Sequence, residues 1–332
     1  MSPDPLVVAV DLGGTKILAG VVGRDGRVHS REWLPSHDLK DRPAALLDRI
    51  AEAVAAAAER ASLPLARVAA VGVGVPGPLD RSRSVVSVAP NLGWEDLAVR
   101  AELERRLSGP RAYLENDVRA AALAEHTFGA GRDYRSLLAV FVGTGVGGGL
   151  ILDGRLYHGS RGGAGELGHV VACAGGPRCG CGRRGCLEAL AARGAVARYV
   201  GEQVARGRRT VLSTLLKGDL DALTSRDLAE AIKQDDPVAV RAARRSARYV
   251  GAAVGGIVNL LDPDAVMLGG GIAEALGQRY VDWAAQAARR QILADSARDL
   301  PIVASELGDD AGLLGAALTA FEGLASGDGS PE

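Results

Sequence analysis

The feature that most constrains the fold is a glycine-rich hairpin that occurs twice. Near the start, LVVAVDLGGTKILAGVV predicts a buried strand, a glycine loop and a second strand, and Asp25-Gly26 predicts the next hairpin turn. About 130 residues later, LLAVFVGTGVGGGLILDG repeats this order. Thr15 precedes Asp25 by ten residues, and Thr144 precedes Asp153 by nine. The pattern predicts a weak internal duplication, in which two similar halves each present a glycine loop.

These loops differ from the common nucleotide-binding loops. Rossmann loops and P-loops lead into a helix and carry G-x-G-x-x-G or G-x4-G-K-[ST], and neither pattern follows the first strand here. DLGGTK at 11–16 still offers clustered backbone N–H groups, a hydroxyl and a lysine, which suit phosphate. An ordinary hairpin with a glycine bulge would explain the same residues. If both loops bind phosphate, the two halves would form two jaws around one polyphosphate.

Composition limits the function classes. The chain has 332 residues with 47% hydrophobic residues and a formal net charge of −1, which predicts about two domains and no basic field for nucleic acid. No apolar run reaches the 18–20 or so residues of a membrane helix. The N-terminal MSPDPLVVAVDLGG lacks the charged region of a signal peptide. We therefore expect a soluble cytoplasmic protein with no nucleic-acid or membrane partner.

The segments between and after the loops predict alternating helices and strands. No linker-like segment divides the chain, and the expected hinge lies near Asp117. The predicted domains are a small one at 1–116 plus about 305–325 and a large one at 117–304, followed by a disordered tail at 326–332. Helices are predicted at 41–61, 94–109, from 118 to near Gly129, 236–259 and 309–324, with strands at 68–75, 111–116 and 265–268.

Three of the four cysteines fall within CGCGRRGC at 179–186. In a reducing compartment, clustered cysteines are more often metal ligands than disulfides. His169 precedes them, and the pattern His-x9-Cys-x-Cys-x4-Cys joins it to Cys179, Cys181 and Cys186 as a Cys3His set. Four protein ligands leave no open position, so the spacing predicts a structural Zn²⁺ site, with free structural thiols as the alternative. Cys173 is expected to be a small buried apolar residue.

Several polar residues are candidates for chemistry. Asp117 follows a strand and opens a helix, so it is either an N-cap or a carboxylate that could accept a proton from a substrate hydroxyl. Glu166 and Glu188 flank the metal motif, where a surface position is the alternative reading. Asn91 in APNLGW is either a turn residue or a hydrogen-bonding partner for a polyol.

Nine motifs, taken in order along the chain, resemble the ROK family of sugar kinases and repressors, and most closely its bacterial glucokinases. The resemblance covers nearly the whole chain, and the zinc motif and GELGH are its most specific parts. The motifs are DLGGTK (11–16), PGPLD (76–80), APNLGW (89–94), END (115–117), GTGVGGG (143–149), GELGH (165–169), CGCGRRGCLE (179–188), LGGG (268–271) and LGDDAGLLGAA (307–317).

The resemblance implies an α/β fold of the actin-like, ribonuclease-H-like ATPase type, duplicated into two α/β domains with a cleft between them. It implies Asp117 as the general base, Mg²⁺ near Asp11 with ATP, and one ring nitrogen of His169 on Zn²⁺ with the other toward sugar. The implied sugar ligands are Asn91, Asn116, Asp117, Glu166, His169 and Glu188. The implied ATP-binding residues are Asp11, Gly13, Gly14, Thr15, Lys16, Gly143, Thr144, Gly145, Gly269, Gly270 and Gly271.

The implied reaction is transfer of the γ-phosphate of Mg·ATP to the 6-hydroxyl of glucose. Kinases for fructose, mannose, N-acetylglucosamine and N-acetylmannosamine share these motifs, and the donor could be ATP or polyphosphate. Within this family, APNLGW, GELGH and the full cysteine motif CGCGRRGCLE favour glucose as the substrate. A sugar-sensing repressor is the less favoured alternative. The repressors of this family carry a helix-turn-helix ahead of the sugar-binding unit, and here DLGGTK already begins within the first dozen residues. A homodimer or homotetramer is expected. Val118 and Arg119 follow END where many relatives show alanine or asparagine, a departure expected to leave the chemistry unaffected.

Overall fold

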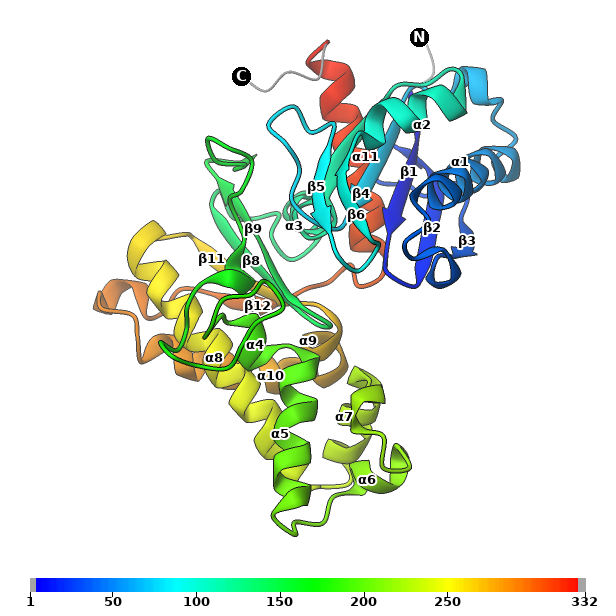
Figure 1. Cartoon of the computed structure of the whole chain (residues 1–332). Helices are drawn as coiled ribbons and strands as arrows, with labels where there is room; N and C mark the ends of the chain where they lie inside the picture. The colour runs from blue at the N-terminus through cyan, green and yellow to red at the C-terminus, as the bar shows by residue number, and fades with distance from the viewer. Residues whose placement is uncertain (1–3, 328–332) are drawn as a thin grey trace. The chain divides into compact units, whose positions relative to one another are not determined.

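The computed structural model describes residues 4–327, which form two compact units (Figure 1). Unit 1 comprises the described residues up to Gly129, Leu156–Ala164 and the described residues from Asp309 onward. Unit 2 comprises Ala130–Arg155 and Gly165–Gly308. Within residues 4–327, no helix combines the length and hydrophobicity that crossing a bilayer requires.

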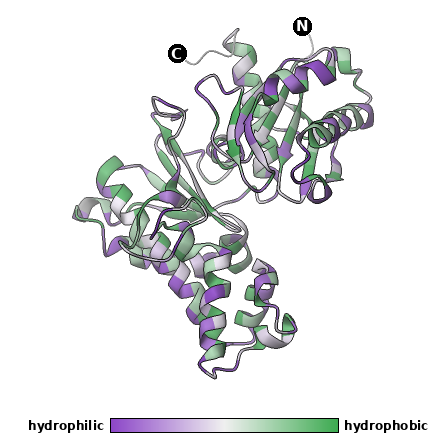
Figure 2. Cartoon of the chain, in the orientation of Figure 1, coloured by the Kyte–Doolittle hydropathy of each residue, from purple (hydrophilic) through white to green (hydrophobic). Residues whose placement is uncertain are grey.

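Unit 1 is built on a five-stranded sheet with the order β3-β2-β1-β4-β7. β1 pairs antiparallel with β2 and parallel with β4, and β4 pairs parallel with β7. The strands are rich in apolar residues (Figure 2), and those of β2 and β4 are buried, as expected for strands covered on both faces. The strands are β1 (Leu6–Leu12), β2 (Lys16–Gly23), β3 (Glu32–Pro35), β4 (Val71–Val75) and β7 (Ala112–Asn116), with a separate hairpin of β5 (Val86–Ala89) and β6 (Trp94–Leu97).

Among the described residues, four α-helices complete unit 1. α11 packs directly against the sheet, since a Cβ on Gly72 would lie 1.8 Å from the carbonyl oxygen of Ala316. It also packs on α3, where a Cβ on Gly315 would lie 1.8 Å from the carbonyl oxygen of Ala120. These contacts require glycine at both positions. The helices are α1 (Pro43–Arg60), α2 (Val99–Leu107), α3 (Asp117–Phe128) and α11 (Asp310–Ala325).

Unit 2 carries a second five-stranded sheet, with the order β10-β9-β8-β11-β12. β8 pairs antiparallel with β9 and parallel with β11, and β11 pairs parallel with β12. The strands are β8 (Leu137–Val142), β9 (Val146–Leu152), β10 (Arg155–Leu156), β11 (Ala265–Gly269) and β12 (Ile302–Ala304). The helices are α4 (Glu188–Ala191), α5 (Arg193–Ala205), α6 (Val211–Leu215), α7 (Ser225–Lys233), α8 (Pro237–Leu261), α9 (Gly271–Leu276) and α10 (Gln278–Arg289).

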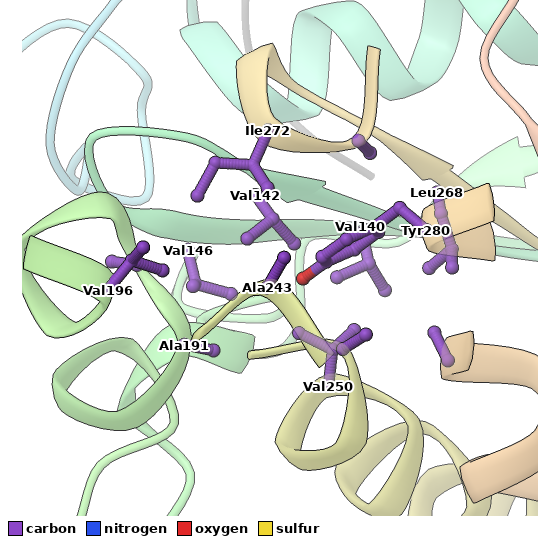
Figure 3. Close-up of a cluster of buried hydrophobic side chains, with 14 of the residues drawn as sticks. Val140, Val142, Val146, Ala191, Val196, Ala243, Val250, Leu268, Ile272 and Tyr280 are labelled. Carbon is purple, nitrogen blue, oxygen red and sulfur yellow. The ribbon is translucent and has the colours of Figure 1, made fainter. Parts of the chain in front are cut away.

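The core of unit 2 lies between its sheet and the long helix α8 (Figure 3). Val140, Val142 and Leu268 of the sheet, with Val250 of α8, are all buried in it. The buried Tyr280 hydroxyl lies 2.8 Å from the Ser246 hydroxyl, which in turn donates to the carbonyl oxygen of Ala191 at 2.6 Å. The polar groups inside this core are therefore hydrogen-bonded.

The predicted internal duplication is confirmed. Each sheet begins, in chain order, with an antiparallel hairpin, β1–β2 in unit 1 and β8–β9 in unit 2. Two further strands run parallel beside the first hairpin strand: β4 and β7 beside β1, and β11 and β12 beside β8. The two glycine loops are the turns of the two hairpins. Because the same strand order recurs, both loops occupy equivalent positions in their own sheets.

Two details differ from the sequence predictions. The helix predicted at 94–109 begins only at Val99, because Trp94–Leu97 pairs antiparallel with β5 and buries the Trp94 ring. The domain boundary expected near Asp117 falls after Gly129, because α3 packs on α11 within unit 1. Of the tail expected to be disordered, 326–332, only Ser326 and Gly327 are among the described residues.

Candidate active site

The first glycine loop, between β1 and β2, is a tight turn. The N–H of Gly13 donates to the carbonyl oxygen of Lys16 at 2.9 Å, and the Ser36 hydroxyl donates to the carbonyl oxygen of Gly13 at 2.9 Å. Gly14 and Thr15 are exposed at its tip. The Lys16 ammonium lies 4.3 Å from the centre of the Trp33 ring and 3.4 Å from a carboxylate oxygen of Asp309. The loop therefore presents backbone N–H groups, a hydroxyl and a held cation together.

Asp11 lies directly before this loop, near the end of β1. Burial raises the pKa of Asp11 to about 6, and Asp309 adds to the rise, while the Lys16 ammonium opposes it. The N-terminal turn of α11 closes over this carboxylate, since a Cβ on Gly312 would lie 2.5 Å from its carbon. A shielded carboxylate that lacks a full counter-charge fits a Mg²⁺ site, because Mg²⁺ takes one or two protein carboxylates and completes its shell with phosphates and water.

Asp117 lies at the same sheet edge as Asp11. In the parallel register Asp11 pairs with Gly74 and Gly74 with Glu115, so β1, β4 and β7 end side by side. A Cβ on Gly74 would lie 3.6 Å from the Cα of Asp117. The carboxyl ends of parallel strands are where open α/β sheets place their sites. Unit 1 therefore brings the phosphate-binding candidates and the candidate base to one edge.

The N-cap of α3 is Asn116 rather than Asp117. The Asn116 side-chain oxygen accepts from the N–H groups of Val118 and Arg119, both at 3.1 Å. Its amide nitrogen donates to Gly77 at 3.2 Å and to Oδ1 of Asp117 at 3.0 Å. All donors and acceptors of the amide are thereby used, so a bond to a sugar would cost Asn116 one of them.

Asn91 follows the β5 strand and is exposed. Its amide nitrogen would lie 3.7 Å from a Cβ on Gly14, so Asn91 stands beside the first glycine loop within unit 1.

In unit 2, the two remaining glycine segments come together. β8 and β11 are parallel neighbours with Phe141 opposite Gly269, so the loops after both strands begin side by side. A Cβ on Gly143 would lie 3.5 Å from the backbone nitrogen of Gly271. Gly270 has φ of +81° and would place a Cβ 2.6 Å from the backbone nitrogen of Val142, so only glycine fits there. The predicted ATP-binding segments 143–145 and 269–271 thus lie side by side in unit 2.

The predicted metal ligands also come together. One ligand atom from each of His169, Cys179, Cys181 and Cys186 lies within 4.8 Å of all the others. The Sγ atoms of Cys181 and Cys186 are 3.7 Å apart, and Sγ of Cys179 is 3.8 Å from Nδ1 of His169. Tetrahedral Zn²⁺ with Zn–S bonds of about 2.3 Å separates neighbouring sulfurs by roughly 3.8 Å. The donor set therefore fits zinc, with Nδ1 as the histidine ligand and Nε2 left over.

The backbone of the cysteine loop explains its glycines. Gly182 and Gly185 have φ of +86° and +79°. A Cβ on Gly185 would lie 1.8 Å from the carbonyl oxygen of Cys173. Cys173 was expected to be buried, but it is half-buried beside the loop and lies outside the four-residue ligand set.

Glu188 contacts both the cysteine loop at 179–186 (the metal loop) and the second glycine loop at 143–145. Its Oε1 lies 3.6 Å from Sγ of Cys179, and its Oε2 accepts from the N–H of Val146 at 3.2 Å. Glu188 is half-buried and opens α4, whereas Glu166 is exposed. Glu166 precedes the short 3-10 helix Leu167–His169, and the N–H of His169 donates to the carbonyl oxygen of Glu166 at 3.1 Å. These three residues lie on one stretch of unit 2.

The sequence interpretation missed a buried charge cluster behind Asp117. Glu115 is 0% exposed and lies 3.0 Å from Nε of Arg119, which is 2% exposed. His158 and Arg83 approach the other carboxylate oxygen at 2.6 and 3.3 Å. Burial acts to raise the pKa of Glu115, but the hydrogen bond from His158 and the charges of Arg119, His158 and Arg83 lower it to about 2. Glu115 lies in β7 and Arg119 in α3, so the i,i+4 rule for pairs on one helix gave no sequence signal for this ion pair.

Comparison with known proteins agrees with this arrangement. The family model described as ROK family matches residues 7–322. The chain is 36% identical over 320 residues to a glucokinase of Streptomyces coelicolor, which covers 96% of this chain and 98% of that protein. It is 33% identical to an N-acetylmannosamine kinase of Citrobacter koseri, over 97% of this chain and 99% of that protein.

Among solved structures, the chain resembles a ROK family glucokinase from Streptomyces griseus in complex with glucose and AMPPNP. The TM-score is 0.84 at 36% identity, and the match covers 96% of this chain and 100% of that chain. The predicted actin-like, duplicated α/β fold is confirmed by this likeness and by the two equivalent sheets. Its sequence over nearly its full length and its fold both establish that this chain belongs to the ROK family.

Proposed function

We propose that this protein is an ATP-dependent hexose kinase that transfers the γ-phosphate of Mg·ATP to the 6-hydroxyl of glucose. The observation that carries the proposal is the position of Asp117. Its carboxylate stands at the end of β7, beside the ends of β1 and β4, and is oriented by the Asn116 amide. The similarity to the glucokinase of Streptomyces coelicolor supports glucose as the acceptor.

Asp117 is the proposed general base. One of its oxygens is engaged by Asn116 and by the N–H of Val118, at 3.0 and 2.9 Å. These bonds hold the carboxylate at the N-terminus of α3, where the helix dipole attracts negative charge. The other carboxylate oxygen would accept the proton of the sugar 6-hydroxyl. As this proton leaves, the 6-oxygen of the sugar would attack the γ-phosphorus in line with the departing ADP.

The glycine segments are the proposed phosphate and nucleotide contacts. In unit 1, Gly13, Gly14, Thr15 and Lys16 would donate hydrogen bonds and charge to phosphate oxygens. In unit 2, Gly143, Thr144 and Gly145 would do the same, and Gly269, Gly270 and Gly271 would lie against the nucleoside. Asp11 would hold Mg²⁺, which neutralises charge on the transferring phosphate. Because the transition state is loose, positioning and charge neutralisation supply most of the catalysis.

Sugar hydroxyls are the proposed partners of Asn91 in unit 1 and of Glu166, His169 and Glu188 in unit 2. Asn116 would act on the sugar mainly through Asp117, because its own amide is already hydrogen-bonded. Zn²⁺ bound by His169, Cys179, Cys181 and Cys186 would fix the loop that carries these side chains. With Nδ1 on the metal, the tautomer of His169 is set and Nε2 donates to the sugar.

An N-acetylmannosamine kinase is the second candidate, favoured by the 33% identity to such an enzyme from Citrobacter koseri. The same base and phosphate contacts would serve either sugar. The test is ADP release by the zinc-loaded protein with Mg·ATP and glucose, mannose, fructose, N-acetylglucosamine or N-acetylmannosamine. The highest kcat/KM for glucose is expected. A preference for an acetamido sugar would support the second candidate, and no turnover with any sugar would refute both.

A further inference from the structure

We propose that the buried ion pair of Arg119 and Glu115 positions Asp117 and fastens residues 156–164 to the rest of unit 1. This inference rests on the proposed function for its kinetic consequence, although the fastening itself does not depend on it. Arg119 would be a positioning residue, since it acts through Glu115 and the backbone around Asp117.

The pair brackets the candidate base. Glu115 lies in β7 and Arg119 in the first turn of α3, with Asn116 and Asp117 between them. Oε1 of Glu115 accepts from the N–H of Asn116 at 2.8 Å and lies 3.0 Å from Nε of Arg119. One buried carboxylate oxygen therefore accepts a hydrogen bond on the strand side of Asp117 and, on the helix side, makes an ion-pair contact that lacks hydrogen-bond geometry. A change in either link would alter the direction in which Asp117 leaves the sheet edge.

The same two side chains hold the segment 156–164. Nη1 of Arg119 donates to the carbonyl oxygen of Gly162 at 2.6 Å, and Oε2 of Glu115 lies 2.6 Å from Nε2 of His158. Gly162 has φ of +75°, and a Cβ there would lie 3.2 Å from the carbonyl oxygen of Leu79. The segment is thus fixed by buried charges and by close backbone packing.

The chain then continues from Ala164 directly into Gly165, Glu166 and the short helix that ends at His169. The first residue proposed to contact sugar, Glu166, therefore lies two positions after the end of the segment that Arg119 contacts. The Arg119 guanidinium contacts both this segment, at the Gly162 carbonyl, and Glu115, whose Oε1 accepts from the N–H of Asn116. An alanine or asparagine at this position would be too short to span both contacts.

The sequence interpretation expected Arg119 to leave the chemistry unaffected. The structure argues otherwise. The Arg119 side chain is 2% exposed, so water cannot take its place, and its removal would leave the buried Glu115 carboxylate without its ion-pair partner. A misplacement of about 1 Å in a reacting group can cost on the order of a hundredfold in rate. Loss of Arg119 is therefore expected to displace the Asp117 carboxylate and so to lower the rate.

The test compares Arg119→Met and Arg119→Lys with the wild type and with Arg105→Met. Arg105 is a matched control, because it forms an exposed ion pair with Glu102 in α2 of the same unit. The measurements are kcat, KM for glucose, KM for ATP, and amide hydrogen exchange of peptides covering 156–164. All are made well below the melting temperature of each variant.

The proposal expects Arg119→Met to lower kcat at least tenfold, to leave KM for ATP within about twofold, and to speed exchange of 156–164. Arg119→Lys should recover part of the loss, since a lysine can reach one of the two contacts. Arg105→Met should match the wild type. Wild-type kcat and exchange in folded Arg119→Met would overturn the proposal, and a loss of kcat with unchanged exchange would overturn the fastening of 156–164.

Two measurements keep the proposal falsifiable if Arg119→Met does not fold. Arg119→Lys with wild-type kcat and exchange would overturn it. In the wild type, the amide of Ala164, which donates to the carbonyl oxygen of His158 at 3.0 Å, should exchange as slowly as amides of the β1–β4 core. Exchange at the rate of an open loop would overturn the fastening. A wild-type protein that phosphorylates no sugar would refute the proposed function, and the exchange data would still decide the fastening.

Discussion

The carboxylate of Glu188 accepts a hydrogen bond from the backbone N–H of Val146 at 3.2 Å. Val146 is the first residue of β9, directly after the glycine loop at 143–145, and Glu188 follows the last cysteine of the metal loop. The other carboxylate oxygen lies 3.6 Å from Sγ of Cys179. Within unit 2, the metal loop and the second phosphate-binding candidate are therefore parts of one arrangement.

Substitution of Glu188 should separate its contacts. Glu188→Gln keeps an oxygen for the Val146 N–H and should change KM for ATP less than twofold, while weakening a proposed sugar contact. Glu188→Ala removes the acceptor, and the loss of about 1 kcal/mol predicts a KM for ATP raised roughly fivefold. Steady-state kinetics with each substrate varied would measure this. Equal KM values for ATP in both variants would show that the Val146 contact does not order the loop.

Removal of the metal should loosen the sugar contacts. Cys181→Ser is expected to lose stoichiometric zinc, because one of four tetrahedral ligands is gone, and to weaken glucose binding. Metal content by mass spectrometry and glucose titration by calorimetry would check both. Cys173→Ser is the matched control, since Cys173 lies outside the ligand set, and it should keep zinc. Full glucose affinity in metal-free Cys181→Ser would remove the loop-shaping role.

Glu115 should make stability fall in acid. Its pKa is about 2 in the folded protein against an ordinary 4.5, so its contribution is complete above about pH 4.5 and is lost as pH falls toward 2. By pH 3 the loss is roughly 2 kcal/mol. Urea unfolding of the wild type and of Glu115→Gln from pH 6 to 3 isolates it, because the difference in free energy of unfolding between them should shrink by that amount. A pH-independent difference would contradict the ion-pair account.

Two glycines of α8 offer a matched pair. A Cβ on Gly251 would lie 2.1 Å from the carbonyl oxygen of Ala284 in α10, whereas a Cβ on the exposed Gly256 would meet nothing within 4 Å. Gly251→Ala should destabilise the protein by about 1–3 kcal/mol through overpacking. Gly256→Ala should stabilise it by up to about 1 kcal/mol, because alanine has the better helix propensity. Thermal unfolding of both variants measures the contrast, and equal effects would contradict the close packing of α8 on α10.

Much of this architecture could be predicted from residue patterns. The two hairpins followed from strand–glycine–strand runs, and the four-residue cluster of candidate metal ligands from spacing alone, because both depend on residues close in the chain. The helix starting at Trp94 was mispredicted, because pairing with β5 and burial of the indole outweighed local helix propensity. The N-cap of α3 is Asn116, whereas the sequence had offered Asp117. Both residue types cap helices well, and only the backbone conformation determines which of the two is the cap.

The contacts that the sequence did not reveal are long-range. Arg119 and Gly162 are 43 positions apart, and so are Glu115 and His158. Val146 and Glu188 are 42 positions apart. No local pattern marks a backbone N–H as the partner of a particular carboxylate. The membership of α3 and 156–164 in unit 1 depends on the same kind of packing, with α11 returning from the end of the chain.

The most direct test of the account is the Asp117→Asn variant. As a general base, Asp117 should contribute about 10²–10⁴-fold to turnover, so kcat for glucose phosphorylation should fall by that factor. The amide retains the hydrogen bond from Val118, so the dissociation constant for glucose, measured by calorimetry, should change less than about threefold. Loss of turnover with retained glucose binding is the predicted result. Near-normal kcat in folded Asp117→Asn would contradict the assignment of Asp117 as the base.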